Sequence, residues 1–258
     1  MCLILLAWRA HEAYPLVVAA NRDEHHARPS AQAGFWQDAP QVLAGRDLEG
    51  QGTWMGMTRE GRFAAVTNFR ETAGTPAREA KSRGTLVSRF LTGDMSAEAY
   101  VQAISAELGE YRGFNLLAGD GQALWYCSNR GGEASALAPG VYGLSNHLLD
   151  TDWPKVRIGK RRLAQALSPA PNADALLRLL ADPHPPLDHE LPDTGVGLER
   201  ERMLGPARIV SSLYGTRCST VLLQRGDGQA EYAEKTWLPE GTEGALLRHA
   251  FRLEDAPA

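Results

Sequence analysis

The sequence has few of the features that would place a protein in a membrane or on nucleic acid. Its 258 residues include only three cysteines, at positions 2, 127 and 218, and their spacing fits neither a disulfide framework nor a metal site. Apolar runs such as Leu3–Trp8 are too short to cross a bilayer, so we predict no transmembrane segment. The formal net charge of −4 lacks the basic footprint of a nucleic-acid-binding protein.

We also predict no secretory signal, because no basic segment precedes a long apolar stretch near the start. Together with the scattered cysteines, this favours a cytoplasmic protein. Hydrophobic residues make up 43% of the chain, which is enough for a core without disulfides or a metal. We therefore predict one domain over residues 1–258; nothing in the sequence indicates its oligomeric state.

Hydrophobic patterning predicts strands, helices, strands, helices and strands, in that order. The predicted strands are Leu3–Trp8, Leu16–Ala20, Gln51–Thr58, Arg62–Asn68, Phe114–Ala118, Ala123–Ser128, Val141–Leu144, Thr216–Leu223 and Ala230–Leu238. The predicted helices are Thr85–Leu91, Ala97–Leu108, 152–167 and Ala173–Leu180, and the proline-rich residues 182–206 are predicted to form a long loop. This order favours an α+β fold with two antiparallel sheets over alternating βαβ units.

Cys2 is the first candidate for chemistry. If Met1 is removed, Cys2 carries a thiol and an α-amine, and an amine with a pKa of about 8 can accept the thiol proton near neutral pH. The alternative is a small buried hydrophobic residue at the start of a strand, which position alone favours.

Four polar residues, Asn21 to Glu24, follow the second apolar run directly. Strand alternation places Asn21 and Asp23 on one face, and Arg22 and Glu24 on the other. Beside a cysteine, Arg22 would lower the thiol pKa, and Asp23 would anchor the α-ammonium. The alternative is a solvated turn.

Other candidates come from later strands. Asn146 or Asn68 would donate to a developing oxyanion, although Asn146 is equally a turn residue. Arg217 would favour the thiolate or hold a substrate carboxylate or phosphate, but such an arginine is usually solvated. Trp54 would line the pocket or pack in the core. Five basic residues between positions 155 and 162, among them Lys155, are expected to form a charged outer helix face.

Several motifs together resemble one family. They are Met1-Cys2-Leu3-Ile4, Asn21-Arg22-Asp23-Glu24, Gly52-Thr53-Trp54-Met55-Gly56, Ala65-Val66-Thr67-Asn68-Phe69-Arg70, Ser82-Arg83-Gly84, Gly113-Phe114-Asn115-Leu116-Leu117, Ser128-Asn129-Arg130, Gly143-Leu144-Ser145-Asn146, Asp152-Trp153-Pro154-Lys155-Val156 and Tyr214-Gly215-Thr216-Arg217-Cys218-Ser219-Thr220-Val221. On these residues the chain resembles the NRDE family, also called the transport and Golgi organisation family. Cys218 departs from the serine that is usual there.

That family in turn resembles the cysteine N-terminal-nucleophile amidases, such as penicillin V acylase and bile salt hydrolase. The resemblance implies a four-layer αββα sandwich of the N-terminal-nucleophile hydrolase type. It implies a site of Cys2, Arg22, Asp23, Asn146 and Arg217, with Asn21, Glu24, Asn68 and Trp54 around the ligand. The amidases separate their arginine and aspartate by two residues, whereas Arg22 and Asp23 are adjacent.

Three functions follow as expectations. The favoured one is binding or trafficking of haem or of a lipid thioester of the acyl-coenzyme A type at Cys2, because the family resemblance implies a link to haem and lipids. The second is a cysteine hydrolase of an amide or thioester, and the third is a non-catalytic interaction protein. No cofactor is expected to be required, and haem enters only as a carried ligand.

Overall fold

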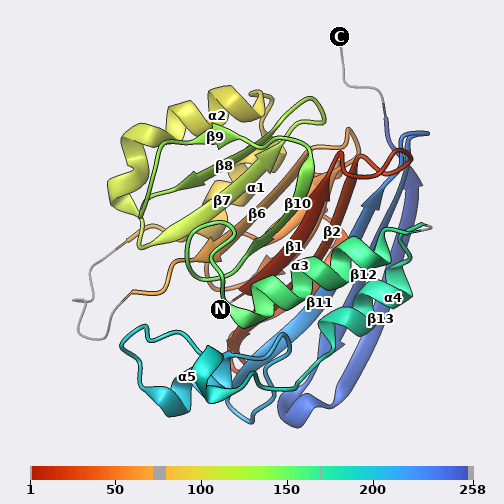
Figure 1. The fold of residues 1–258 in the computed structure, drawn as a ribbon. Coiled ribbons are helices and arrows are strands. Elements are labelled where there is room, and N and C mark those ends of the chain that lie inside the picture. Colours follow the sequence, from red (N-terminus) through yellow and green to blue (C-terminus); the bar gives the residue numbers. More distant parts are fainter. Residues whose placement is uncertain (1, 72–79, 169, 255–258) are drawn as a thin grey trace.

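Two antiparallel sheets stacked face to face form the centre of the protein. The computed structural model describes residues 2–71, 80–168 and 170–254 (Figure 1). The first sheet has the order β10-β1-β2-β11-β12-β13, and the second has the order β3-β4-β5-β6-β7-β8-β9. Strands β1 and β2 are both interior strands of the first sheet, which fits their nearly continuous apolar sequences.

The strands and helices have the following bounds. In the first sheet they are β1 Cys2–Trp8, β2 Leu16–His25, β10 Gly140–Leu144, β11 Tyr214–Gln224, β12 Gln229–Trp237 and β13 Glu243–Arg252. In the second sheet they are β3 Ser30–Phe35, β4 Val42–Asp47, β5 Met55–Thr58, β6 Phe63–Asn68, β7 Phe114–Gly119, β8 Leu124–Ser128 and β9 Ser135–Ala136. The helices are α1 Gly84–Thr92, α2 Ala97–Ile104, α3 Pro154–Ala166, α4 Ala173–Leu180 and α5 Leu198–Leu204, with short 3₁₀ turns η1 Ser105–Glu110, η2 Asp188–Glu190 and η3 Pro239–Gly241.

Three apolar clusters separate four layers. The central cluster lies between the sheets and takes alternate residues of β1, such as Ile4 and Leu6. Their neighbours Leu3 and Leu5 face the opposite way and pack under α3 and α4. A third cluster joins the outer face of the second sheet to α1 and α2. The order helix–sheet–sheet–helix confirms the predicted α+β sandwich.

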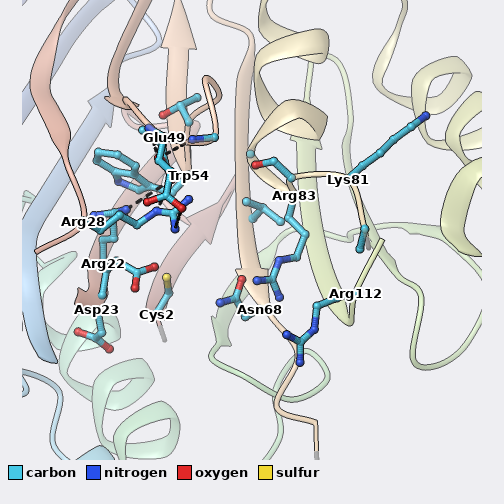
Figure 2. Close-up of a pocket in the computed structure, with 18 residues that line it drawn as sticks. Cys2, Arg22, Asp23, Arg28, Glu49, Trp54, Asn68, Lys81, Arg83 and Arg112 are labelled. Atoms are coloured by element: carbon cyan, nitrogen blue, oxygen red, sulfur yellow. Dashed lines mark hydrogen bonds and ion pairs between the residues drawn. The ribbon is translucent and has the colours of Figure 1, made fainter. Parts of the chain in front are cut away.

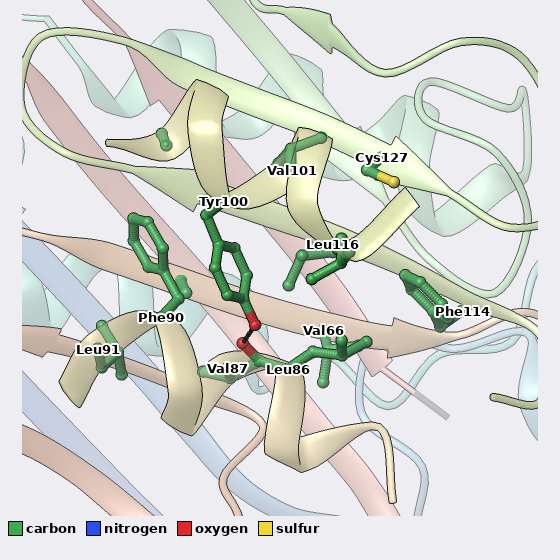
Figure 3. Packing of buried hydrophobic residues seen from close by; sticks show 14 of the residues in the cluster. Val66, Leu86, Val87, Phe90, Leu91, Tyr100, Val101, Phe114, Leu116 and Cys127 are labelled. Atoms are coloured by element: carbon green, nitrogen blue, oxygen red, sulfur yellow. Dashed lines mark hydrogen bonds between the residues drawn. The ribbon is translucent and has the colours of Figure 1, made fainter. Parts of the chain in front are cut away.

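The cluster under α1 and α2 is closed by one buried polar contact. Tyr100 of α2 points toward α1, and its hydroxyl donates to the Leu86 carbonyl at 2.6 Å (Figure 3). The Phe90 ring packs against the Tyr100 ring in a tilted arrangement, with centroids 5.2 Å apart and an interplanar angle of 52°. α2 begins where the Ser96 hydroxyl accepts from the Ala99 N–H, a side-chain cap of the usual kind. This layer covers the second sheet behind the pocket described below.

Several elements differ from the sequence-based expectation. Strands β3 and β4 were not predicted; in β3 only one of six residues is buried, and the strand shows no alternation. The predicted strand Gln51–Thr58 begins only at Met55, since residues 51–54 approach α1 as a loop. The segment 182–206 is not all loop, because it contains α5. A third closing strand, β13, adds an edge to the first sheet. Among the described residues, no helix is both long and apolar enough to span a membrane.

Candidate functional site

Cys2 opens β1 at the edge of a pocket between the two sheets. It pairs across the sheet with Arg22 of β2, and alternation directs its side chain to the same face as Ile4. The half-buried thiol lines a pocket of about 390 Å³. In Figure 2, Cys2 lies between Arg22 on one side and Asn68 with Arg83 on the other. Cys2 of the first sheet, the candidate nucleophile, therefore shares this pocket with residues of the second sheet.

The backbone of Cys2 is held by polar groups that follow β10. Its N–H donates to Asn146 Oδ1 at 3.3 Å, and its carbonyl accepts from the Ser145 hydroxyl at 2.9 Å. The Asn146 side-chain amide donates in turn to the Asn68 carbonyl at 2.7 Å. Asn146 is 1% exposed. Its side chain connects the segment after β10 to the start of β1 in the first sheet and to the end of β6 in the second. One of its two amide hydrogens is thus used at a backbone carbonyl, and the side chain does not line the pocket.

Arg22 and Asp23 diverge as strand alternation requires. The Arg22 guanidinium lies 4.3 Å from the centre of the Trp54 ring and 3.8 Å from the Asp47 carboxylate. Asp23 Oδ1 accepts from the Thr216 hydroxyl at 2.6 Å on the other face of the sheet. Both side chains are nearly fully buried, and both reach the pocket because β2 ends close by. Arg22 and Asp23 therefore both line the pocket, although their side chains lie on opposite faces of β2.

Burial raises the pKa of the Cys2 thiol, and the charge of Asp23 raises it further. Arg22 and a hydrogen bond from the Asp23 N–H to the sulfur act in the opposite direction. Burial also raises the pKa of the Asp23 carboxyl, and Lys155 is the strongest influence against that rise. The thiol therefore needs a base before it can act as a nucleophile at neutral pH.

Charged side chains dominate the pocket wall. The cations are Arg22, Arg28, Lys81, Arg83 and Arg112, and the anions are Asp23, Glu24, Asp47 and Glu49. Most of the cations have carboxylate partners: Arg28 pairs with Asp47 at 2.8 Å, and Arg112 pairs with Glu71 at 2.7 Å. Arg83 donates to the Gly113 carbonyl at 3.1 Å, and within residues 2–71, 80–168 and 170–254 it forms no ion pair. Arg83 is therefore the cation best placed to meet an anionic ligand.

Two expected site residues lie outside the pocket wall. The Asn21 side chain turns toward α4, where it donates to the Leu180 and Ala207 carbonyls at 2.9 and 2.7 Å. Arg217 sits at a bulge in β11, and its guanidinium donates to the His25 and Arg28 carbonyls at 2.8 and 3.0 Å. Both side chains fix the ends of strands that carry the site. The structure thus brings together Cys2, Arg22, Asp23, Glu24, Trp54 and Asn68 on the pocket wall, with Asn146 behind Cys2.

Several residues of the pocket wall had no role in the sequence-based prediction. Arg28, Asp47 and Glu49 come from the turn after β2 and from the end of β4, a strand that was not predicted. Arg83 stands in a motif quoted for the family resemblance, Ser82-Arg83-Gly84, which was the one available signal. Lys155, expected on a charged outer face, is instead 6% exposed. In the described parts of the chain, no group of three or more His, Cys, Asp or Glu side chains is arranged to hold a metal ion.

Comparisons with known proteins agree with the resemblance. The family model for transport and Golgi organisation 2 matches residues 1–239. The transport and Golgi organization protein 2 homolog of Bos taurus is 37% identical, over 98% of this chain and 100% of its own length. The Mus musculus homolog is 35% identical, over 94% of this chain and 95% of its own.

A solved structure identifies the type of fold. The Caenorhabditis elegans ortholog of N-acylethanolamine-hydrolyzing acid amidase superposes with a TM-score of 0.51, covering 86% of this chain and 92% of that chain. Because the two are only 9% identical, this likeness concerns the fold alone. It confirms the predicted sandwich of the N-terminal-nucleophile hydrolase type. Because the family model matches nearly the whole length of this chain, the chain belongs to the transport and Golgi organisation 2 family.

Proposed function

We propose that the pocket binds a small anionic acyl compound and that Cys2 cleaves its thioester or amide bond. One observation carries the proposal: the Cys2 N–H is held by Asn146 Oδ1 at 3.3 Å while its thiol lines a pocket rich in cations. Removal of Met1 would convert this backbone nitrogen into an α-amine. The amine would then sit on the same residue as the thiol, with Asn146 as its hydrogen-bond acceptor.

The chemistry follows from that arrangement. The α-amine takes the proton of the thiol, the Cys2 sulfur attacks the acyl carbonyl carbon, and a new C–S bond forms. The bond to the leaving thiol or amine breaks, and the leaving group takes the proton from the α-ammonium. Water then attacks the acyl-enzyme with the amine as base, and the Cys2 thiol leaves with a proton. The net reaction is hydrolysis to a carboxylic acid and a thiol or amine.

Asn68 is the better placed of the two candidate oxyanion donors. One of the two hydrogens of the Asn146 amide is used at the Asn68 carbonyl, and Asn146 is not among the residues that line the pocket. The Asn68 side chain lines the pocket and has no hydrogen-bond partner within the described residues. A donor preorganised at the oxyanion is typically worth about 3 kcal/mol.

The charge of the wall sets the ligand class. Arg83, Arg112 and Lys81 lie on the far side of the pocket from Arg22, where the leaving group of a bound substrate would extend. Guanidinium groups bind carboxylates and phosphates through paired hydrogen bonds. An acyl-coenzyme A carries phosphates, and an N-acyl amino acid carries a carboxylate, so both fit this wall.

Haem carriage stays a prediction, with Cys2 as the axial thiolate. Half of the wall residues are charged, which supports a polar ligand more than a porphyrin face. Pure carriage of an acyl thioester, with no turnover, is the other form of the binding expectation. It predicts that Cys2→Ala leaves affinity for the acyl compound unchanged and that no product forms.

The test is a hydrolysis assay on a long-chain acyl-coenzyme A and on an N-acyl amino acid, with wild type and Cys2→Ala. We expect release of free coenzyme A or amino acid by wild type only, while Cys2→Ala still binds the substrate. Arg83→Met should raise KM, whereas Arg89→Met, which removes an arginine paired with Glu107 outside the pocket, should not. Release that survives Cys2→Ala would overturn the proposal, and so would its absence from wild type with Met1 removed. Haem binding lost in Cys2→Ala would favour the carrier.

A further inference from the structure

A second pocket lies on the face of the first sheet that α3 and α4 cover (Figure 1). It has a volume of about 260 Å³ and lies between α3, the loop that follows α4 and the residues after α5. Leu3 of β1 lines it, with its side chain on the opposite side of the sheet from the central cluster. Among the described residues, this pocket and the Cys2 pocket have no lining residue in common. It is therefore a separate site.

Two ion pairs tie the loop after α4 to α3 at the second pocket. Arg162 of α3 pairs with Asp182 at 2.6 Å, and Arg157 pairs with Glu190 at 2.7 Å. Asp182 also accepts a hydrogen bond from the His184 N–H at 3.1 Å. The side chains of both ion pairs are partly exposed, and their charges balance. The walls of the pocket are therefore held in place without a ligand.

Most of the residues that line the second pocket are apolar. Ile158 of α3 and Leu179 of α4 come from the two helices, and Pro185, Pro186 and Leu187 come from the loop. Leu187 is 64% exposed, so part of this apolar surface is open to solvent. An apolar ligand that covers such a surface is favoured, because it removes the surface from water.

Lys155 of α3 differs from the other charged residues of this pocket, because its side chain is only 6% exposed. Its ammonium donates to the Leu204 carbonyl at 3.0 Å, and within the described parts of the chain it forms no ion pair. Glu201, the buried carboxylate of α5, pairs with Arg70 instead. Since Leu204 directly precedes Gly205, which lines the pocket, the ammonium lies at this wall. Two of its three hydrogens remain for a ligand.

We propose that the second pocket binds a monocarboxylate with an apolar chain. The carboxylate accepts from the Lys155 ammonium, and the chain packs against Ile158 and Leu179. One water molecule takes about 30 Å³ in the liquid, so the pocket holds roughly nine non-hydrogen atoms, which is a chain of about six to eight carbons. Asp182 and Glu190 repel a second negative charge, so phosphates are disfavoured. The inference goes beyond the proposed function, because Cys2 takes no part in it.

The test is isothermal titration calorimetry with octanoate on wild type, Lys155→Met and Lys160→Met. We expect Lys155→Met to weaken octanoate binding about tenfold or more, because a hydrogen bond to a charged group is lost. Lys160→Met is the matched control, because Lys160 lies on the same helix, pairs with Asp150 at 2.8 Å and does not line the pocket. It should bind octanoate as wild type does. Equal affinity in wild type and folded Lys155→Met would overturn the inference, and so would no binding to wild type.

Two further variants keep the test decisive if Lys155→Met fails to fold. Ile158 is half-buried, so Ile158→Glu adds a carboxylate to the wall at a partly exposed position, and octanoate binding should be lost. Arg83→Met changes only the Cys2 pocket and should leave octanoate affinity unchanged. Binding that survives Ile158→Glu, or that is lost in Arg83→Met, would overturn the inference. None of these measurements depends on turnover, so a chain without hydrolase activity would defeat the proposed function and still decide this inference.

Discussion

Cys2 is positioned through its backbone. The side-chain oxygen Oδ1 of Asn146 accepts from the Cys2 N–H, and the Ser145 hydroxyl donates to the Cys2 carbonyl, while the Cys2 side chain lines the pocket. The two asparagines at the site thus differ in role. Asn146 orients the residue that reacts, and Asn68 faces the space where a substrate carbonyl would lie.

Substitution of the two asparagines should separate these roles. Asn68→Ala is expected to lower kcat about a hundredfold to a thousandfold, because an oxyanion donor acts mainly in the transition state. KM and the rate of Cys2 alkylation by iodoacetamide should barely change. Asn146→Ala should alter both kcat and the alkylation rate, because it releases the Cys2 backbone. Steady-state kinetics beside alkylation rates distinguish the two. An Asn68→Ala variant with wild-type kcat would remove Asn68 from the mechanism.

At the scale of elements, the loop before β5 and the start of α1 meet without space for a side chain. The Thr53 N–H donates to the Gly84 carbonyl at 3.3 Å, and a Cβ on Gly52 would lie 2.4 Å from the Gly84 carbonyl carbon. Both segments form part of the pocket wall, because Trp54, which follows Gly52, and Arg83, which precedes Gly84, both line the pocket. The close approach therefore sets the width of the pocket.

Gly52→Ala should consequently destabilise the fold by about 1–3 kcal/mol, because the clash is with backbone atoms that cannot rotate away. Gly34→Ala is the matched control, since nothing lies within 4 Å of the Cβ it would add on β3. Urea denaturation measures both variants. Equal midpoints for wild type and Gly52→Ala would show that the contact is not rigid.

Glu71 joins the segment after β6 to the start of β7. Its carboxylate accepts from the Gly113 N–H at 3.0 Å and pairs with Arg112 and Arg130 at 2.7 and 2.8 Å. Burial alone would raise the Glu71 pKa, but these contacts lower it from 4.5 to about 2. A depressed carboxyl pKa stabilises the fold above the unfolded value and loses that effect as pH falls toward the folded value.

We therefore expect Glu71 to contribute stability above pH 4.5 that disappears progressively between pH 4.5 and about 2. Glu71→Gln should be less stable than wild type at pH 7, and the difference should shrink across that interval. Denaturant unfolding at a series of pH values measures it. A difference that stays constant with pH would mean that the charge of Glu71 is not what the fold uses.

For the whole molecule, the sequence predicted what local pattern encodes. Leu3–Trp8 reads as a buried strand because both its faces are covered, and β1 has nearly those bounds. Strand alternation alone predicted that the Arg22 and Asp23 side chains lie on opposite faces of β2. The Arg217 placement fails because a bulge in β11 breaks the register, and Lys155 is buried by α5, which lies far along the chain. Neither effect leaves a periodic signal in the sequence.

The measurement closest to the central claim is the mass of the N-terminal peptide after brief incubation with a long-chain acyl-coenzyme A and acid quenching. The account predicts a peptide that begins at Cys2 and carries the acyl group as a thioester, and an unmodified peptide from Cys2→Ala. A peptide that retains Met1, with no acyl group on Cys2, would contradict it.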